Sequence, residues 1–430
     1  MFKKLFLALI WLLLAAALAF YAWSWQGEMA PVAKPAPSAF SPQLIAKGEM
    51  LAGIGNCAAC HTVKGRAPFA GGRPLATPFG DIHATNITPD TETGIGNWSQ
   101  AAFQRAMREG VRRDGEHLFP VFPYTHFNLV SDEDLSALYA YFMTRAPVHA
   151  EALENALPFP LNVRALQAGW KLLFFAPRPL PTDVGKSVDW NRGRYLAEGL
   201  AHCAACHTPR NRLGAEIAAS SYLGAPIDGW FAPALTAANP APLPWTEAEL
   251  TSYLRLGATA LHGVAAGPMS EVVHQGLKLA PDADIHALAV YFADLSQAGL
   301  AAPNARATLQ QAMARPVPAS GQSSERGASL YLAACAACHS NSNGAPQLLR
   351  PELTLNSALT APDPANLLRV IVHGVGRDEG LPAVLMPPFG AALSDRDIAE
   401  LAGYLRRTRT DLPPWPELEA GVAAARRRQP

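Results

Sequence analysis

Three copies of one motif, Cys-Ala-Ala-Cys-His, carry the most specific chemistry in this sequence. They occupy residues 57–61, 203–207 and 335–339 and contain all six cysteines of the 430-residue chain. C-x-x-C-H is the attachment motif of c-type haem, because two thiols one helical turn apart add to the vinyl groups of one haem while the adjacent histidine ligates the iron. The sequence therefore predicts three covalently bound haem c groups. The predicted haem-bound thiols are those of Cys57, Cys60, Cys203, Cys206, Cys335 and Cys338, and the predicted proximal ligands are His61, His207 and His339.

Other uses of paired cysteines explain the pattern less well. A structural zinc site needs further cysteine or histidine ligands near each pair, and none lies nearby in the sequence. A thioredoxin-like dithiol belongs in an alternating strand and helix pattern, which this chain lacks. Disulfides remain an alternative in an oxidising compartment.

A low-spin haem that carries electrons needs a second axial ligand, often methionine. This ligand is expected on the loop before the last helix of each unit. Met386 lies eight residues before Ser394, and Met269 lies twelve residues before Pro281. We predict that Met269 ligates the second haem iron and Met386 the third.

The first unit departs from this pattern. Phe122 stands where the third unit has its methionine, and phenylalanine cannot bind iron. His126, four residues further on, is the preferred replacement and would give a haem of lower potential with two histidine ligands. His117, Met107 and an open iron site are the alternatives, whereas Met143 is expected in the core of the closing helix.

The ring of a metal-bound histidine usually donates its other nitrogen to a backbone carbonyl. Pro68 and Pro346 each follow their haem histidine by seven residues. The sequence therefore suggests these two prolines as sources of the acceptor carbonyl.

Each motif sits within the same plan of expected elements: an entry helix, the motif, a long loop, and an exit helix with acidic residues in its first turn. The expected helices are 43–54, 99–110, 135–144, 192–198, 285–295 and 398–407, with a further entry helix before Cys335. No strong strand pattern occurs. The fold class is therefore mostly α, with three tandem class I cytochrome c domains after an N-terminal transmembrane helix.

The expected segments follow from the motif positions and from proline-rich stretches. They are 1–26 (anchor or signal), 27–41 (tether), 42–156 (first cytochrome c domain), 157–186 (connector with a short apolar helix), 187–299 (second domain), 300–322 (linker), 323–410 (third domain) and 411–430 (tail). The tether is expected to leave the orientation of the first domain unfixed. The basic end of the tail, 426–428, is expected to be solvated.

The N-terminus has the features of an exported, membrane-attached chain. Lys3 and Lys4 precede an uncharged run, 5–26, that is long enough to span a bilayer. Trp23 and Trp25 resemble an interfacial aromatic belt, and the lysines place the start in the cytoplasm. We favour an uncleaved anchor over a cleaved signal peptide, with the rest of the chain on the periplasmic face of the bacterial inner membrane.

Composition excludes some other classes. The chain has 35 basic and 35 acidic residues, so no basic field favours nucleic acid. Hydrophobic residues make up 49% and charged residues 16%, which suits buried cofactors and a membrane contact.

Several longer stretches resemble one known family, the membrane-bound triheme cytochrome c subunits of periplasmic dehydrogenases of acetic acid bacteria and their relatives. They are 86–90 (NITPD), 94–98 (GIGNW), 119–127 (FPVFPYTHF), 203–214 (CAACHTPRNRLG), 267–273 (GPMSEVV) and 386–390 (MPPFG). The resemblance covers nearly all of residues 48–407. It implies an electron conduit that carries electrons from a separate catalytic subunit to membrane ubiquinone or to a terminal acceptor.

The resemblance implies two kinds of catalytic partner. One is a quinoprotein or flavoprotein dehydrogenase; the other is a molybdenum hydroxylase with an iron–sulfur subunit. Many quinoprotein-linked members carry methionine where this chain has Phe122. The version with Phe122 and His126 resembles the cytochromes linked to molybdenum hydroxylases, such as those of aldehyde or nicotinate dehydrogenases.

Two functions of other classes compete with electron transfer. The chain could be a haem enzyme, a peroxidase or oxidase component, that uses an open iron at the first haem, as Phe122 suggests. A haem-based sensor ranks lowest, because no signalling module is visible in the sequence. On the leading hypothesis the chain itself has no chemistry on the organic substrate.

Overall fold

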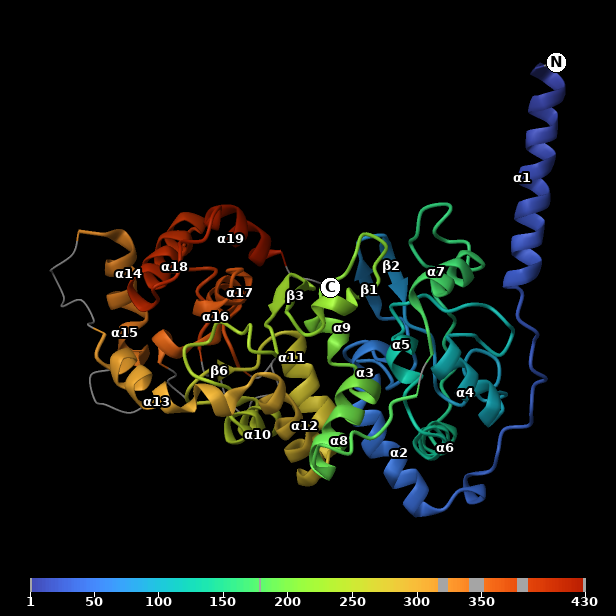
Figure 1. Ribbon diagram of the computed structural model, residues 1–430, viewed down its shortest axis with the longest axis horizontal. Helices are drawn as coiled ribbons and strands as arrows, with labels where there is room; N and C mark the ends of the chain where they lie inside the picture. The colour runs from blue at the N-terminus through green and yellow to red at the C-terminus, as the bar shows by residue number, and fades with distance from the viewer. Residues whose placement is uncertain (1, 178, 316–323, 340–351, 377–385, 428–430) are drawn as a thin grey trace. The chain divides into compact units, whose positions relative to one another are not determined.

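The computed structural model describes residues 2–177, 179–315, 324–339, 352–376 and 386–427 (Figure 1). The chain is mostly helical, as predicted. It forms two compact units, one of residues 1–52 and 60–181 and one of residues 53–59 and 182–430. Each unit is described by itself.

Along residues 1–181 the longer helices fall near their predicted positions, whereas the short helix Tyr124–Phe127 was not predicted. The elements are α1 (Phe2–Ser24), a 3-10 turn (Pro37–Ala39), α2 (Pro42–Ile54), α3 (Cys57–His61), β1 (Pro74–Thr77), β2 (Gly80–His83), α4 (Gln100–Glu109), α5 (Tyr124–Phe127), α6 (Asp132–Met143) and α7 (Leu166–Phe174). The short helix expected in the connector is α7.

The helices of residues 182–430 also match the expected plan. The entry and exit helices are α8 (Val188–Tyr195) with α12 (Asp282–Leu295), and α14 (Arg326–Ala334) with α18 (Asp395–Arg409). Between or after them lie α9 (Ala204–His207), β3 (Ala225–Ile227), β4 (Trp230–Ala232), α10 (Glu247–Leu256), β5 (Ala258–Thr259), β6 (Gly263–Val264), α11 (Pro268–Glu271), α13 (Ala298–Met313), α15 (Ala336–His339), α16 (Ser357–Thr360), α17 (Ala365–His373) and α19 (Leu418–Arg426). Single-turn segments complete the described elements: Leu196–Leu200, Ala218–Ser220, Val272–Gly276, Leu277–Leu279 and Leu353–Leu355.

A glycine on each entry helix touches the main chain of its exit helix. A Cβ added to Gly48 would lie 2.0 Å from the Ala137 carbonyl oxygen, and one added to Gly193 would lie 2.0 Å from that of Ala287. The same contact recurs between Gly327 and the carbonyl of Glu400, at 2.5 Å. Only glycine allows two helices to approach this closely.

The residue before each of these glycines is basic and pairs with an aspartate in the first turn of the exit helix. The pairs are Lys47 Nζ with Asp134 Oδ1 at 2.8 Å, Arg192 Nε with Asp284 Oδ1 at 2.7 Å, and Arg326 Nη2 with Asp397 Oδ1 at 2.8 Å. We call the basic residue, the glycine and the aspartate the crossing clamp. In each copy the glycine faces the residue three positions after the aspartate, so one geometry occurs three times.

Serine caps begin two of the exit helices. The Ser131 hydroxyl accepts the backbone N–H of Asp134 at 3.1 Å. Ser394 and Asp397 form a reciprocal capping box at the start of α18. Both caps satisfy N–H groups that a helix N-terminus otherwise leaves unpaired.

Three antiparallel hairpins in the described part of the chain were not predicted. β1 pairs with β2, β3 with β4, and β5 with β6, and each strand is at most four residues long. Strands this short show too few residues for an alternation of apolar and polar side chains to be recognised, so the sequence did not predict them.

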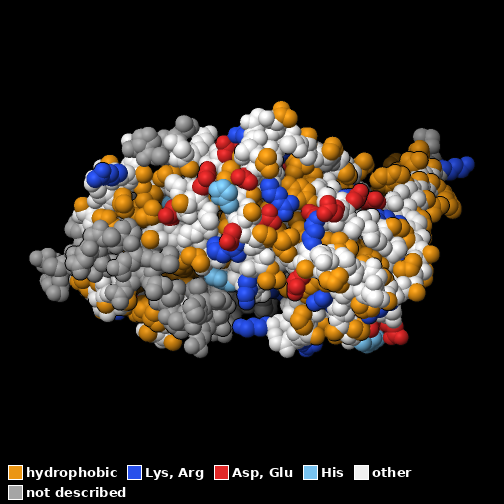
Figure 2. Space-filling model, turned by 90° about the horizontal axis from the view of Figure 1, so that it is seen from below, with side chains coloured by type: hydrophobic (Ala, Val, Ile, Leu, Met, Phe, Trp, Pro, Cys, Tyr) orange, Lys and Arg blue, Asp and Glu red, His pale blue; other side chains and the backbone are white. Residues whose placement is uncertain are grey.

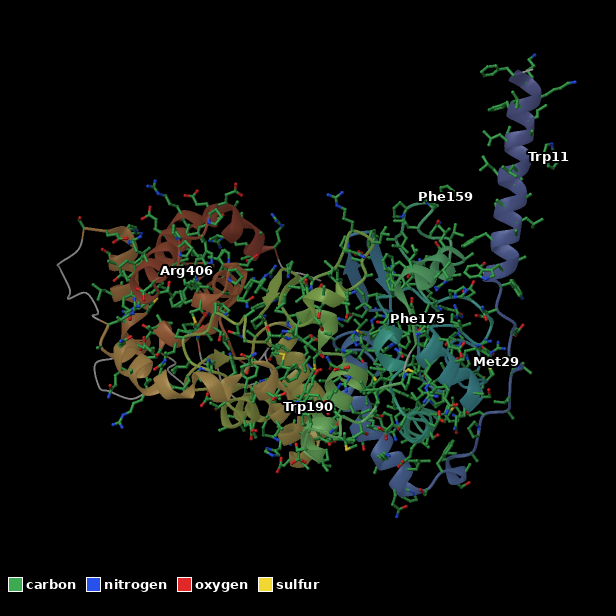
Figure 3. All side chains as sticks on the ribbon, viewed as in Figure 1. Trp11, Met29, Phe159, Phe175, Trp190 and Arg406 are labelled. Carbon is green, nitrogen blue, oxygen red and sulfur yellow. The ribbon has the colours of Figure 1, made fainter. Side chains whose placement is uncertain are left out.

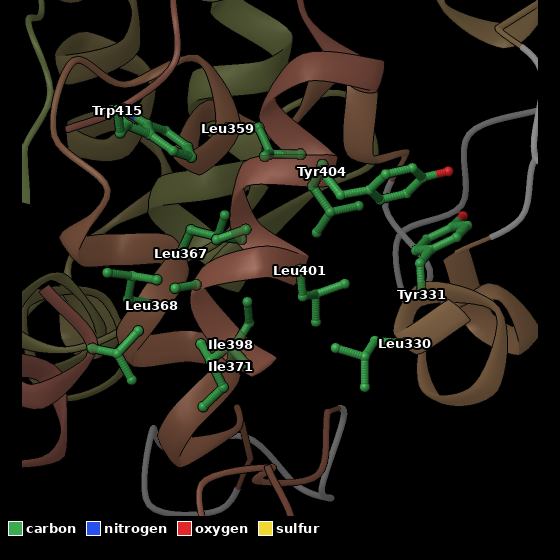
Figure 4. Packing of buried hydrophobic residues seen from close by; sticks show 14 of the residues in the cluster. Leu330, Tyr331, Leu359, Leu367, Leu368, Ile371, Ile398, Leu401, Tyr404 and Trp415 are labelled. Atoms are coloured by element: carbon green, nitrogen blue, oxygen red, sulfur yellow. The ribbon is translucent and has the colours of Figure 1, made fainter. Parts of the chain in front are cut away.

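The described part of the tail is folded up to Arg426, which corrects the expectation of a solvated end for that residue, whereas Arg427 is exposed and residue 428 lies outside the described residues. Trp415, Val422 and Ala425 are buried in one cluster with side chains of α17 and α18, and Figure 4 shows Trp415 beside Leu359 and Leu367. The Arg426 guanidinium binds the Asp395 carboxylate and donates to the Leu393 carbonyl at 2.6 Å.

The tether is also bound along its length rather than free. The contacts are His117 Nε2 with the Ser24 carbonyl at 2.8 Å, Arg105 Nη1 with that of Gly27 at 2.7 Å, Met29 N with that of Arg113 at 2.8 Å, and Val32 N with that of Asn97 at 2.9 Å. The expectation of an unfixed orientation is therefore wrong for the end of α1, which is tied to its own unit.

Helix α1 meets the length and composition expected of a membrane span. It is the one helix of the described residues that does so, with a mean hydropathy of 2.5 over its most apolar stretch, none of which is buried. Figure 2 shows its surface covered by hydrophobic side chains, with the basic residues at its N-terminal end. A signal sequence near an N-terminus passes the same test, so both sequence interpretations stand.

Replacing Gly193 by alanine tests the crossing clamp. The new methyl group would meet the Ala287 carbonyl oxygen at 2.0 Å, so the helices must separate. We expect a loss of about 1–3 kcal/mol of unfolding free energy, as for other overpacked contacts. Gly299→Ala is the control, because this α13 glycine has nothing within 4 Å of an added Cβ. Unfolding of the full chain measures both variants, and equal destabilisation would contradict the clamp.

Candidate haem sites

Each Cys-Ala-Ala-Cys-His motif forms a single helical turn. The turns are α3, α9 and α15, and the first cysteine of the second and third motifs directly precedes its helix. Asn56 and His202, which precede the first two motifs, have left-handed backbones with φ of 49° and 40°. This geometry turns the chain sharply between the entry helix and the motif.

The six motif cysteines are free thiols, and none forms a disulfide. Burial, reinforced by the second thiol of the pair, raises the pKa of Cys203 to about 12 and that of Cys335 to about 11. These two groups are therefore neutral thiols. No group of three or more metal-binding side chains occurs among the described residues.

The histidines of the first two motifs are held in one tautomer by backbone carbonyls. His61 Nδ1 lies 2.7 Å from the Thr85 carbonyl oxygen, and His207 Nδ1 lies 2.7 Å from that of Pro233. Since a carbonyl only accepts, Nδ1 carries the proton and Nε2 keeps its lone pair. Burial lowers the pKa of both imidazoles, which favours the neutral form that binds iron.

The source of these carbonyls corrects the prediction for the first site. Thr85, and not Pro68, accepts from His61; Pro346 lies outside the described residues. Thr85 comes just after β2, and Pro233 comes directly after β4. The acceptor is therefore positioned by a hairpin, which sequence spacing did not reveal.

Two further contacts fix the loop that follows each of these histidines. The Thr62 hydroxyl accepts the N–H of Phe69 at 3.0 Å, and the Thr208 hydroxyl accepts that of Tyr222 at 3.0 Å. Phe69 and Tyr222 both have left-handed backbones. The carbonyls of the two histidines accept the N–H groups of Gly71 at 2.9 Å and Gly224 at 2.8 Å. Each of these histidines is thus fixed twice, its ring by a backbone carbonyl and its own carbonyl by a glycine N–H.

Both predicted methionine ligands lie in well-defined segments. Met269 is partly buried on the short helix α11, which follows Gly267 in a left-handed conformation. Met386 exchanges backbone hydrogen bonds of 2.9 and 3.0 Å with Val375, and its side chain packs on the core of the third haem-motif segment. Iron ligation by these two residues stays a prediction.

In the first unit the structure separates the alternatives to methionine. His117 has both ring nitrogens engaged, Nε2 by the Ser24 carbonyl and Nδ1 by Lys171 Nζ at 2.9 Å, which makes it unsuited to bind iron. His126 is buried on α5 and Met107 is buried on α4. Met143 is fully buried on the exit helix, as expected of a core residue.

One polar group beside the second motif also fits a haem. Among the described residues, the Tyr222 hydroxyl is buried without a protein partner. The nearby Cys203 adds to the burial that raises the pKa of Tyr222. A buried hydroxyl without a protein partner can be satisfied by a ligand or by water. The cysteine pair, the oriented imidazole and this hydroxyl together suit a covalently bound haem.

Comparison with known proteins agrees with this site and defines a c-type cytochrome. Residues 45–146 match the cytochrome c family, and residues 322–405 match the family of cbb3-type cytochrome c oxidase subunit III. The chain is 41% identical over 381 residues to the gluconate 2-dehydrogenase cytochrome c subunit of Pantoea cypripedii, covering 84% of this chain and 85% of that one. It is 38% identical over 392 residues to the fructose dehydrogenase cytochrome subunit of Gluconobacter japonicus, covering 86% and 80%. The chain belongs to the family of dehydrogenase cytochrome c subunits.

A third relative is a much longer protein. This subunit of the nicotinate dehydrogenase of Pseudomonas putida is 46% identical over 406 residues, which are 94% of this chain and 33% of that protein. The chain therefore spans about a third of the length of this relative.

Replacing Thr208 by valine tests the loop that holds His207. Thr208 is 2% exposed, so the Tyr222 N–H would lose its acceptor without gaining water. We expect a loss of about 1–3 kcal/mol of unfolding free energy. Thr236→Val is the control, because its hydroxyl accepts an exposed N–H at 3.3 Å that water can satisfy. The control should change stability by less than about 0.5 kcal/mol; equal effects would show that the loop contact does not stabilise the site.

Proposed function

We propose that this chain is a triheme electron-transfer subunit that carries electrons from a catalytic dehydrogenase subunit to membrane ubiquinone. The observation that carries the proposal is the threefold recurrence of one arrangement: a C-x-x-C-H turn beside a crossing clamp. Bound haem c supplies one-electron redox chemistry. The protein supplies two thiols and a histidine at each site, with the imidazole oriented by a backbone carbonyl at the first two, and the chemistry on the organic substrate belongs to the catalytic partner.

Three tandem cytochrome c domains follow from the same recurrence. The family models match the first and last segments, and the middle segment repeats their clamp with Arg192, Gly193 and Asp284. The hydrogen bond from His207 to Pro233 repeats the one from His61 to Thr85. This repetition supports a haem in the middle segment.

We place the chain at the periplasmic face of the bacterial inner membrane, anchored by α1. The exposed apolar surface of α1 and its two N-terminal lysines support this placement. Ubiquinone in the same bilayer is then within reach as the electron acceptor.

A redox titration of axial-ligand variants tests the assigned haem ligands. A redox titration of the wild type should show three one-electron steps. Met386→His should lower one of the three midpoint potentials by on the order of 0.1 V, because imidazole stabilises ferric iron relative to a thioether. Met143→Leu, in the core of α6, should leave all three unchanged. A Met386→His protein with unaltered potentials would remove Met386 from the ligand set.

The molybdenum hydroxylase type is our choice of catalytic partner. The identity to the nicotinate dehydrogenase relative, 46%, exceeds the 41% and 38% to the gluconate and fructose dehydrogenase subunits. Phe122 and His126 give the same indication through the resemblance to cytochromes linked to molybdenum hydroxylases. A partner that uses pyrroloquinoline quinone or flavin is the alternative.

Purification of the native complex in mild detergent, followed by cofactor analysis, tests the partner. We expect molybdenum and an iron–sulfur subunit to co-elute with the cytochrome. Pyrroloquinoline quinone or flavin without molybdenum would place the chain with the alcohol and sugar dehydrogenases instead. In that case Phe122 and His126 would not mark the partner.

A second candidate function uses an open first haem as a peroxidase or oxidase site. Phe122 favours it, because its ring packs on Phe127 at the position expected for a ligand, with centroids 5.2 Å apart. Rapid binding of CO to the reduced native protein would support this function. Three unreactive haems would exclude it.

A further inference from the structure

The segment before and within α7 has an apolar outer surface. Its large exposed side chains are Phe159 (82% exposed), Leu172 (73%), Leu173 (68%), Leu161, Val163 and Leu166 (38% each). We call these six residues the α7 surface. A contiguous apolar surface of this kind on a protein marks a contact with a partner or a membrane.

The two charged residues of 155–177 are both turned inward. Arg164 Nη1 donates to the His117 carbonyl at 3.0 Å, and its Nε pairs with Glu116 at 3.2 Å. Lys171 Nζ donates to the Glu109 carbonyl at 2.5 Å and to that of Gly110 at 2.9 Å. Neither cation therefore faces outward among the exposed leucines, and the outer face of this segment is uncharged.

Helix α7 lies against the last turns of α1, in the same compact unit. A Cβ added to Gly169 would lie 3.6 Å from Phe20 Cζ, so the Phe20 ring covers this position. His117 joins the two helices, because Nε2 binds the Ser24 carbonyl and Nδ1 binds Lys171. The orientation of α7 to α1 is thus fixed by both packing and hydrogen bonds.

The contact at Phe20 sets the depth of α7 relative to a bilayer around α1. Phe20 packs on Trp23, with centroids 5.7 Å apart, and Trp25 follows two residues later. Aromatic residues at the end of a membrane span mark the headgroup level. Figure 3 shows Phe159 at the tip of the loop before α7, on the side of this unit that carries α1. A bilayer that surrounds α1 therefore extends over the α7 surface.

We propose that α7 and the loop before it form a second, monotopic membrane contact that dips into the headgroup and acyl-chain boundary beside α1. This inference rests on the proposed anchoring by α1. The two contacts together fix which side of the first haem-motif unit faces the membrane. An uncharged apolar face with inward cations suits such an interfacial position.

Lipid photocrosslinking of the full chain in nanodiscs tests the contact. Single cysteines replace Leu172 on α7, Leu18 on α1 (70% exposed) and Glu133 on α6 (side chain 79% exposed). Each is labelled with a benzophenone maleimide, illuminated and analysed for lipid adducts by mass spectrometry. The unsubstituted chain, whose own cysteines would be consumed by haem, gives the background.

We expect lipid adducts at Leu172→Cys and Leu18→Cys and none at Glu133→Cys. Adducts at Leu18→Cys alone would leave the α1 anchor intact and overturn the α7 contact. Absence of adducts at both would overturn the anchor itself and the inference with it. Crosslinks from Leu172→Cys to protein instead of lipid would show that another chain covers this face, which would also overturn the membrane contact. Leu173→Cys repeats the test at the neighbouring position.

Discussion

A glycine that lets two helices touch main chain to main chain is the contact on which each haem-motif segment depends. The basic residue before it and an aspartate on the facing helix add an ion pair, so both distance and direction of the crossing are set. The first cysteine of each motif follows its glycine by eight to ten residues. Because the entry helix leads into the motif, fixing its crossing with the exit helix also fixes where the thiols and the histidine emerge.

The sequence predicts the elements of this arrangement better than their contacts. Motif spacing and helix signals place the entry and exit helices to within a few residues. The Lys-Gly and Arg-Gly pairs at 47–48, 192–193 and 326–327 are visible once the three motifs are aligned, and they are a signal that the prediction did not use. By contrast, the carbonyl of Thr85 meets His61 only because a hairpin of two four-residue strands returns the chain. Neither the periodicity of the sequence nor a fixed spacing from the histidine predicts this hydrogen bond.

Composition did not predict that the tail and the tether are bound, because both are bound through backbone carbonyls. The basic tail and the proline-rich tether both have the composition of solvated chain. Yet the Arg426 guanidinium donates a hydrogen bond to the carbonyl of Leu393, and the Arg105 guanidinium donates one to the carbonyl of Gly27. Every residue offers the same carbonyl, so its position depends on tertiary structure alone. A charged or proline-rich stretch can therefore be bound without any complementary side chain in the sequence.

The link between α1 and α7 also bears on the ligands of the first site. His117 uses both ring nitrogens to join these helices, which removes it from the set of candidate ligands. Of the remaining two, Met107 lies within α4, 24 residues before the Ser131 cap, whereas His126 lies five residues before it. The methionines predicted for the other two haems lie eight and twelve residues before their exit-helix boundaries. Position in the loop before the exit helix, the feature common to all three units, therefore favours His126 over Met107.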